Sequence, residues 1–292
     1  MLLYEQIQSN KRKTIVIVAF FIVFVIAVGS TLTYIMAGDF VTGAIFTTVF
    51  ATIYAGIILM SSTKVVMSMN HAKEIKSKNE NPFLWNSVEN LAMVARIPMP
   101  RVFIINDPSP NAFATGTSPK NGAVAVTTGL LERLNREEVE GVLAHEVAHI
   151  KNFDIRLATI ALALVSVVAI ISDLGSRMIF YARGGRDKKQ HPAVLIIALV
   201  LLVLSPLIAS LIKLAISRNR EYLADASATE LTRNPNALAS ALEKITGVAT
   251  PVREASSASA SLYFADPLKK KMAGLMSTHP PAEERIKRLR QM

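Results

Sequence analysis

The stretch His145-Glu146-Val147-Ala148-His149, read within residues 140–154, decides how the rest of the chain is interpreted. It has the form H-E-x-x-H. On a helix, residues four positions apart share a face, so two imidazoles can hold one zinc ion while the glutamate faces the same cleft. The pattern therefore indicates metal-dependent hydrolysis, provided that the rest of the chain supplies a helix, a third ligand and a cleft.

A helix around this motif is expected from its flanks. Asn135 is a good N-cap, and Glu137 and Glu138 would complement the helix dipole in the first turn. Apolar residues within 139–144 give the helix a side that can pack on a core. We therefore predict that the motif helix begins near Asn135.

The composition is that of a membrane protein. Hydrophobic residues make up 51% of the 292, in long blocks, and the mean hydropathy is +0.36. The net charge of +10 comes from basic residues that flank these blocks and form no groove with aromatics, so we expect membrane-surface anchoring and no nucleic acid. The absence of cysteine excludes disulfides and Cys-ligated zinc, and leaves His, Asp and Glu as metal ligands.

The first two apolar blocks predict a transmembrane hairpin. Residues 14–36 would reach about 35 Å as a helix, which is enough to cross a bilayer, and residues 41–62 follow after a short turn. Lysines and arginines lie before the first block and after the second, while the turn contains only Asp39. The positive-inside rule then places both ends in the cytoplasm. We interpret the first block as a retained anchor and not as a cleaved signal.

Two further apolar blocks, residues 157–172 and 193–216, follow the motif. The first of them is short for a span, and the basic segment 177–191 between them would lie outside if both crossed. Two crossings and a re-entrant hairpin both remain open.

The polar parts of the chain predict helices and a small sheet. Residues 63–100 read as helical with a break at Asn81-Pro82, and residues 102–105 read as a strand. Asn121-Gly122 reads as the link of a hairpin between residues 111–116 and 123–127. Asn234-Pro235 begins a helix to about Thr246, and residues 277–281 open a last helix over Ala282–Leu289.

The expected fold is a mainly α-helical integral membrane protein with four hydrophobic blocks. Its zincin-like, gluzincin-type α+β catalytic domain contains a small β-sheet. The expected parts are a transmembrane hairpin (1–62), a cytoplasmic catalytic part with the sheet and motif helix (63–156), a second hydrophobic hairpin (157–216), and a cytoplasmic part with the third ligand and C-terminal helices (217–292).

Glu221 is the leading candidate for the third ligand. Glu221 lies directly after the fourth apolar block, and the motif lies directly before the third. An even number of membrane crossings between them therefore returns Glu221 to the same membrane face as His149. Asp225 lies one turn further on and can accept a hydrogen bond from a ligand histidine. Glu146 is then the general base, which takes a proton from water and passes it to the leaving amine.

Several residues keep two interpretations. Glu221 can instead pair with Arg218 or Arg220 on the surface. Asp154 is either a residue that orients a ligand or a simple break after the motif helix. His279 either donates to a developing oxyanion or caps the helix that follows Pro280-Pro281.

These residues also carry a family resemblance. The chain resembles the HtpX-type membrane-bound zinc metalloproteases, which are relatives of the CAAX prenyl endopeptidases. The resemblance is carried by the H-E-x-x-H motif with Asp154, by Glu221-Tyr222-Leu223-Ala224-Asp225, by the segments 111–116 and 277–281, and by the order of the apolar blocks.

The resemblance implies one zinc ion per chain, held by His145, His149 and Glu221, with Glu146 as base and Asp225 behind a histidine. It implies a multi-pass protein of the cytoplasmic membrane that cleaves misfolded or damaged membrane proteins, often under stress. Its partners would be unfolded polypeptides and the lipid bilayer, with membrane proteases or chaperones as further candidates. By analogy, an edge strand would pair with extended substrate; its residues are Asn111, Ala112, Phe113, Ala114, Thr115 and Gly116.

Two other functions compete with this one. An intramembrane zinc protease would carry its motif inside an apolar span, whereas charged residues surround the motif here. A non-catalytic zinc-dependent scaffold or transporter has no need of a base at Glu146, and paired intramembrane carboxylates that would mark an ion path are absent from the sequence.

Overall fold

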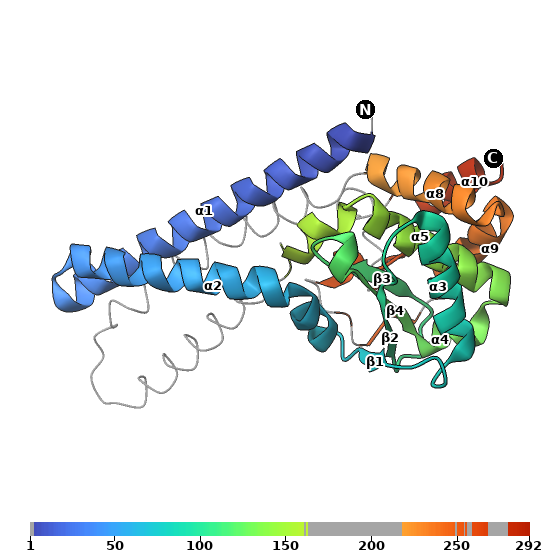
Figure 1. The fold of residues 1–292 in the computed structure, drawn as a ribbon, viewed down its shortest axis with the longest axis horizontal. Coiled ribbons are helices and arrows are strands. Elements are labelled where there is room, and N and C mark those ends of the chain that lie inside the picture. The colour runs from blue at the N-terminus through green and yellow to red at the C-terminus, as the bar shows by residue number, and fades with distance from the viewer. Residues whose placement is uncertain are drawn as a thin grey trace.

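A computed structural model describes residues 3–160, 162, 218–248, 250–253, 255, 259–267 and 280–292. Figure 1 shows a long helical hairpin that projects from a body of helices around a small sheet. Within the described residues the fold is mainly helical with one four-stranded sheet, in agreement with the expected class. The third and fourth apolar blocks lie almost entirely outside these residues.

The hairpin consists of α1 (Leu3–Ala37) and α2 (Phe40–Met69). Gly38 adopts a positive φ of 73°, and Asp39 then caps α2 by accepting hydrogen bonds from the backbone N–H groups of Val41 and Thr42. This is the tight turn that the sequence predicts, and it forces the two helices to run antiparallel.

The surface of the hairpin is apolar. Ile15, Phe46 and Met60 are 65%, 76% and 89% exposed, and many other large apolar side chains on both helices are also exposed. Within the described residues, one stretch, Phe40–Ile57 of α2, is long and apolar enough to cross a membrane by length and composition. Both predicted spans lie inside helices, because 14–36 falls in α1 and 41–62 in α2.

The sheet has the order β1-β2-β4-β3. Its strands are β1 (Lys73–Ile75), β2 (Arg101–Ile105), β3 (Ala112–Thr115) and β4 (Ala123–Thr127). The β3–β4 pair is the antiparallel hairpin predicted around Asn121-Gly122, although its link includes a short 3-10 helix, η1 (Pro119–Asn121). β2 and β4 are parallel, and β3 lies at one edge of the sheet.

Both faces of the sheet are buried, which explains why its strands are apolar at successive positions. Val102, Val124 and Val126 pack toward α3 and the motif helix in the main core. On the other face, Phe103 and Ala125 form a second core with Val66 and Met67 from the end of α2 and with Tyr263. The hairpin is therefore packed directly onto the sheet.

Helices surround the main core, and their starts follow local capping rules. Asn81 and Asn234 each cap a helix whose first residue is proline. The helices of the body are α3 (Pro82–Ala95), α4 (Thr128–Arg133), α5 (Arg136–Lys151), α8 (Arg218–Thr232), α9 (Pro235–Gly247) and α10 (Ala282–Leu289), with a 3-10 turn η2 (Ser259–Leu262).

The motif helix α5 occupies the centre of the body, between α3, α8, α9 and the β3 strand. Its start is as predicted: the Asn135 side chain accepts from the Glu138 N–H at 2.9 Å, and Glu138 accepts from the Asn135 N–H. Gly141 allows α9 to come close, because a Cβ there would lie 3.1 Å from the backbone of Leu238.

The segment 63–100 is less helical than predicted. It contains the end of α2, the unpredicted strand β1 and the helix α3, which begins at the predicted break at Asn81-Pro82. β1 is fixed by long-range contacts, because Glu74 and Arg101 on the neighbouring strand form a two-pronged ion pair at 2.6 and 2.7 Å. A three-residue strand leaves no period in the sequence from which to predict it.

Candidate metal centre

Three side chains from two helices converge at the C-terminal half of α5. His145 and His149 come from α5, and Glu221 comes from the first turn of α8, 72 positions after His149 in the sequence. One ligand atom from each of the three lies within 4.8 Å of the others. The His145 and His149 side chains are 1% and 14% exposed, and that of Glu221 is 9% exposed.

The nitrogens in this cluster are arranged for a cation. The Nε2 atoms of His145 and His149 lie 3.0 Å apart, and each is 3.6–3.7 Å from an oxygen of Glu221. If Nδ1 of each ring carries the proton, the two Nε2 atoms are both acceptors and cannot bond to each other. A metal ion between them would satisfy both lone pairs and the Glu221 carboxylate, so these residues fit a metal site.

The outer atoms of the histidines support that tautomer. Nδ1 of His145 lies 2.9 Å from Oδ1 of Asp225, and Nδ1 of His149 lies 3.4 Å from Oδ2 of Asp154. Carboxylates in this position hold a ligand ring and leave Nε2 for the metal. The structure thus brings Asp225 and Asp154 to the two rings.

Asp154 reaches His149 because the chain breaks after α5. Residues five apart on a continuous helix point in different directions. Here Asn152 ends α5, Phe153 adopts a φ of 59°, and helical structure resumes at Asp154. The structure contains both the break after α5 and the contact of Asp154 with His149, since the break turns the carboxylate toward that ring.

Burial and neighbouring charges shift the pKa values of the two histidines in opposite directions. Burial lowers the pKa of His145 to about 4, with Arg285 adding to the effect against the opposing pull of Asp225. Burial would also lower the pKa of His149, but the contact with Asp154 and the charge of Glu221 raise it to about 9. These shifts favour a neutral His145 and a protonated His149 in the metal-free chain at neutral pH, so the Nε2–H of His149 would donate to Nε2 of His145 at 3.0 Å, and a metal ion would replace that proton.

Glu146 lies next to the cluster and touches the edge strand. Its side chain is buried, and its carboxylate accepts a backbone hydrogen bond from Ala114 of β3. Burial raises the pKa of Glu146 to about 7, with the nearby charge of Glu221 contributing in the same direction. A carboxylate whose pKa lies near neutrality is suited to take up and release a proton.

Arg285 of α10 also reaches the cluster, and sequence reasoning missed it. Its side chain is 1% exposed and forms a two-pronged pair with Asp225, Nε to Oδ2 at 2.9 Å and Nη2 to Oδ1 at 2.7 Å. The last helix has four other charged residues, Glu283, Glu284, Lys287 and Arg288, so nothing local distinguishes Arg285 from them. His279 lies outside the described residues.

The predicted substrate-binding segment is an edge strand, but part of its edge is covered. The Phe264 N–H donates to the Ala112 carbonyl at 2.8 Å, and Phe113 forms an isolated antiparallel bridge with Tyr263. The Asn111 side chain is bound to the backbone of Ala265, both as donor and as acceptor. Asn111, Ala112 and Phe113 are thus engaged by the chain itself.

The other half of the strand lies closer to the cluster. Hydrogen bonds alternate along an antiparallel pair, and the Asn111 carbonyl faces β4, so the peptide groups of Ala114 face away from β4. Thr115 and Gly116 end the strand, where both are bound to the hydroxyl of Thr159. Ala114 is therefore the strand residue placed beside Glu146.

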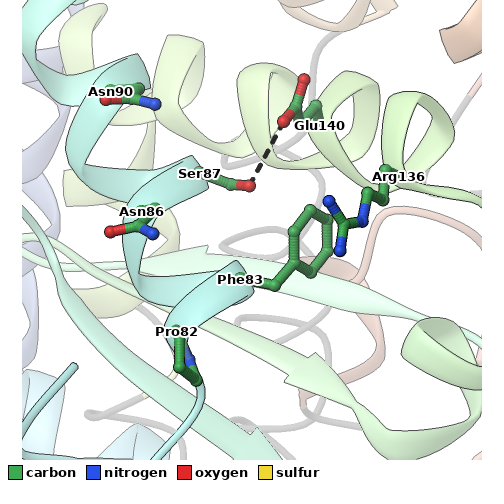
Figure 2. A pocket seen from close by; sticks show the side chains of 7 residues that line it. All are labelled: Pro82, Phe83, Asn86, Ser87, Asn90, Arg136 and Glu140. Carbon is green, nitrogen blue, oxygen red and sulfur yellow. Dashed lines mark hydrogen bonds between the residues drawn. The ribbon is translucent and has the colours of Figure 1, made fainter. Parts of the chain in front are cut away.

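A separate hollow of about 330 Å³ lies between α3 and α5 (Figure 2). Arg136 and Glu140 contribute to it from α5, and each lies nine residues, or about two and a half turns, before one of the two histidines. The hollow is therefore on the opposite side of α5 from the metal cluster. Its lining consists of Pro82, Phe83, Asn86, Ser87, Asn90, Arg136 and Glu140.

Two histidines one turn apart, a buried carboxylate between them and a glutamate from a later helix define a metallopeptidase of the H-E-x-x-H class. Comparison with known proteins gives the family. Residues 78–292 match the sequence profile of peptidase family M48, so the chain belongs to this family and is a metalloprotease.

Relatives match over their full length. A protein described as "Protease HtpX homolog" from Listeria monocytogenes serotype 4a is 52% identical over 304 aligned positions, covering all of both chains. One from Leuconostoc citreum, with the same description, is 50% identical over 298 positions, again covering both chains completely. With the exposed apolar hairpin, this similarity makes the chain a membrane protein.

A solved structure is also similar. The crystal structure of S. mikatae Ste24p is 21% identical and aligns with a TM-score of 0.48. The alignment covers 89% of this chain and 64% of that chain, so the chain spans less than two thirds of its length.

Proposed function

We propose that this protein is a zinc-dependent endopeptidase that cleaves misfolded or damaged membrane proteins at the cytoplasmic face of the cell membrane. The observation that carries the proposal is the triangle of His145, His149 and Glu221 with the buried Glu146 beside it. A purely structural metal site has no use for a carboxylate whose burial raises its pKa to about 7.

Zinc suits the donor set better than other common metals. Two imidazoles and one carboxylate are the ligands of many catalytic zinc sites, which keep a fourth position open. Ligands about 2.1 Å from a tetrahedral ion lie about 3.4 Å from each other. The separations of 3.0, 3.6 and 3.7 Å within the triangle are close to that value. We therefore propose one zinc ion per chain.

Glu146 would act as the general base. Bound zinc supplies Lewis acidity, which polarises the scissile carbonyl and lowers the pKa of water at its open position toward about 7. Glu146 takes the proton of the attacking water and returns it to the leaving amine. Asp225 and Asp154 hold the histidine rings so that Nε2 of each faces the ion.

Substrate would bind as an extended strand at the half of β3 that begins at Ala114. Addition of a strand to a sheet edge uses the peptide groups of the substrate and reads its side chains weakly. That mode suits a protease that acts on many unfolded polypeptides. Phe264 occupies the Ala112 carbonyl, Glu146 accepts from the Ala114 N–H, and Thr159 accepts from the Gly116 N–H. We therefore place the pairing at the Ala114 carbonyl and not along the whole segment.

The apolar hairpin would anchor the enzyme in the bilayer. Lys11, Arg12 and Lys13 precede its apolar part and Lys64 follows it, so the positive-inside rule puts the body in the cytoplasm. The end of α2 packs on the same sheet that carries β3. Substrate domains that emerge from the membrane would thus meet the cleft. Membrane proteases or chaperones are candidate partners in such quality control under stress.

Other functions fit less well. An intramembrane protease would hold its metal within the spanning helices, whereas this cluster lies between α5 and α8 of the body. A non-catalytic scaffold or transporter would leave Glu146 without a role. Specific removal and return of the metal separates the proposed function from a non-catalytic scaffold or transporter.

The test uses the full chain in detergent with an unfolded membrane protein as substrate. A zinc chelator should abolish cleavage, and one equivalent of zinc per chain should restore it, whereas magnesium should not. Cleavage that continues after the metal has been removed, as verified by metal analysis, would contradict the proposal.

A further inference from the structure

Arg285 is buried at the point where three helices meet. It comes from α10, it pairs with Asp225 of α8, and its Nη2 lies 3.4 Å from Nδ1 of His145 on α5. Its Nη1 is 3.8 Å from an oxygen of Glu221. One guanidinium thus contacts a proposed metal ligand on each of the two ligand-bearing helices.

The carboxylate of Asp225 is held by both His145 and Arg285. Oδ1 of Asp225 receives both Nδ1 of His145, at 2.9 Å, and Nη2 of Arg285, at 2.7 Å, while Oδ2 receives Nε of Arg285. A two-pronged arginine–carboxylate pair sets the plane of the carboxylate as well as its position. Asp225 therefore cannot rotate away from the histidine without breaking two further hydrogen bonds.

The charges in the cluster also require a cation at this place. Glu146, Glu221, Asp225 and Asp154 are all buried and would carry four negative charges when ionised. A divalent metal would balance two of them, and the buried Arg285 and Arg220 would balance the other two. An isolated charge is costly to bury, so removal of Arg285 alone would favour a displaced Asp225.

Arg285 holds the cleft wall as well. Its Nη1 donates to the Phe264 carbonyl at 3.3 Å, and its guanidinium stacks over the Phe264 ring at 4.9 Å from the centroid. The Phe264 ring in turn packs edge-on against His145, with ring centroids 5.0 Å apart. The ring of His145 is thus held by Asp225 on its edge and by Phe264 on its face, and both depend on Arg285.

We propose that Arg285 is a positioning residue of the metal centre, which acts through Asp225 to fix the orientation and tautomer of His145. The inference rests on the proposed metal function of this cluster. It makes the C-terminal helix α10 a part of the metal site. Arg285 is argued to act on the metal ligands, mainly through Asp225 on His145, with a longer ion-pair contact of 3.8 Å to Glu221.

A purely structural brace between α8 and α10 is the competing role. It predicts a loss of stability when Arg285 is changed but an unaltered metal site in the protein that remains folded. A positioning role predicts weaker metal binding and altered ligand geometry in variant protein that remains folded. Removal of partners behind metal ligands weakens metal affinity by about 10–100-fold.

The experiment compares full-length wild type with Arg285→Lys, Arg285→Gln and the control Arg290→Gln in detergent. Arg290 follows the same helix and pairs with Glu243 at 2.6 Å, but both side chains are largely exposed. Zinc affinity is measured by competition with a chromophoric chelator, and the visible absorption of the cobalt-substituted protein reports ligand geometry. The fluorescence of Trp85, the single tryptophan, reports folding.

We expect both Arg285 variants to bind zinc about 10–100-fold more weakly and to show altered cobalt bands, with Arg290→Gln unchanged. Lysine keeps the charge but cannot make the two-pronged contact, so it should not restore the wild-type spectrum. Wild-type zinc affinity and cobalt bands in folded Arg285→Lys would overturn the proposal.

A double variant guards against unfolding. Asp225→Asn with Arg285→Gln removes both charges and leaves no unpaired ion in the core. If Arg285 acts through Asp225, the double variant binds zinc as weakly as Asp225→Asn alone, to within about twofold. Additive losses from the two changes would overturn the proposal. Wild type that binds no zinc would instead refute the proposed function itself, so the two failures are distinguishable.

Discussion

Zinc binding should release one proton from His149 at neutral pH. The contact with Asp154 and the charge of Glu221 outweigh burial and raise the pKa of His149 to about 9 in the metal-free chain. A metal ligand must be neutral, so the proton leaves on binding and lower pH weakens the affinity. His145, with a pKa of about 4, is already neutral above pH 6 and adds nothing.

The size of the effect follows from that pKa. For a single group of pKa about 9, the apparent dissociation constant rises about 90-fold from pH 8 to pH 6, or about 2.7 kcal/mol. For an unperturbed histidine of pKa 6.5, the same change is only about fourfold. At pH 7 the two cases release about 1.0 and about 0.2 protons per zinc.

Calorimetric titration in buffers of different protonation enthalpy measures this proton count directly. The Glu146→Gln variant is the right background, because the pKa of Glu146 also lies near 7 and its titration would overlap. Asp154→Asn in that background removes the strongest cause of the raised pKa of His149, so its proton release at pH 7 should fall. Release below about 0.3 protons in the Glu146→Gln protein would refute the assignment of charge to His149.

Three further changes test the ligand set and the frame around it. Glu221→Gln should weaken zinc binding by more than about 100-fold, which exceeds the loss expected when a residue that only hydrogen-bonds to a ligand is removed. The circular dichroism spectrum should stay unchanged, and wild-type zinc affinity would remove Glu221 from the ligand set. Asn135→Ala should destabilise α5 by about 1 kcal/mol in denaturant titrations followed by Trp85 fluorescence, because it removes the cap. Gly129→Ala should cost about 1–3 kcal/mol, because its Cβ would lie 2.1 Å from the Pro108 carbonyl oxygen, and Gly247→Ala, with open space around it, should cost less.

The local features of this fold could be predicted from the sequence because their causes are local. Asn135 with Glu138 three positions later is a capping box, and the structure contains both of its hydrogen bonds. Asn234 likewise caps α9 with its side chain, and Pro235 is the first residue of that helix. The approach of Glu221 to His149 is long-range, yet membrane topology predicts it, because an even number of crossings returns the chain to one face.

The rest depends on contacts that no short segment encodes. The strand β1 depends on its pairing with β2, more than 25 positions later, and on burial of Ile75, while the role of Arg285 depends on its burial against Asp225. Coverage of the Ala112 carbonyl by Phe264 could not be predicted either, since residues 253–261, which lead to Phe264, are small and polar and resemble a loop. Such contacts appear only when distant parts of the chain are placed together.

The packing of α2 on the sheet suggests that membrane anchoring and catalysis are structurally linked. Val66 and Met67 at the end of α2 share a core with Phe113 of β3 and with Tyr263. The Tyr263 hydroxyl also donates to Asn70, directly after α2. The anchor and the wall of the cleft are therefore parts of one packed unit.

The central claim is that Glu146 performs the proton transfer at a metal held by His145, His149 and Glu221. The direct test is the cleavage of an unfolded membrane protein by zinc-loaded wild type and Glu146→Gln, with the zinc content of both determined. We predict one zinc per chain in both proteins, and a loss of at least about 100-fold in rate for the variant. Equal cleavage rates by the two zinc-loaded proteins would contradict the account.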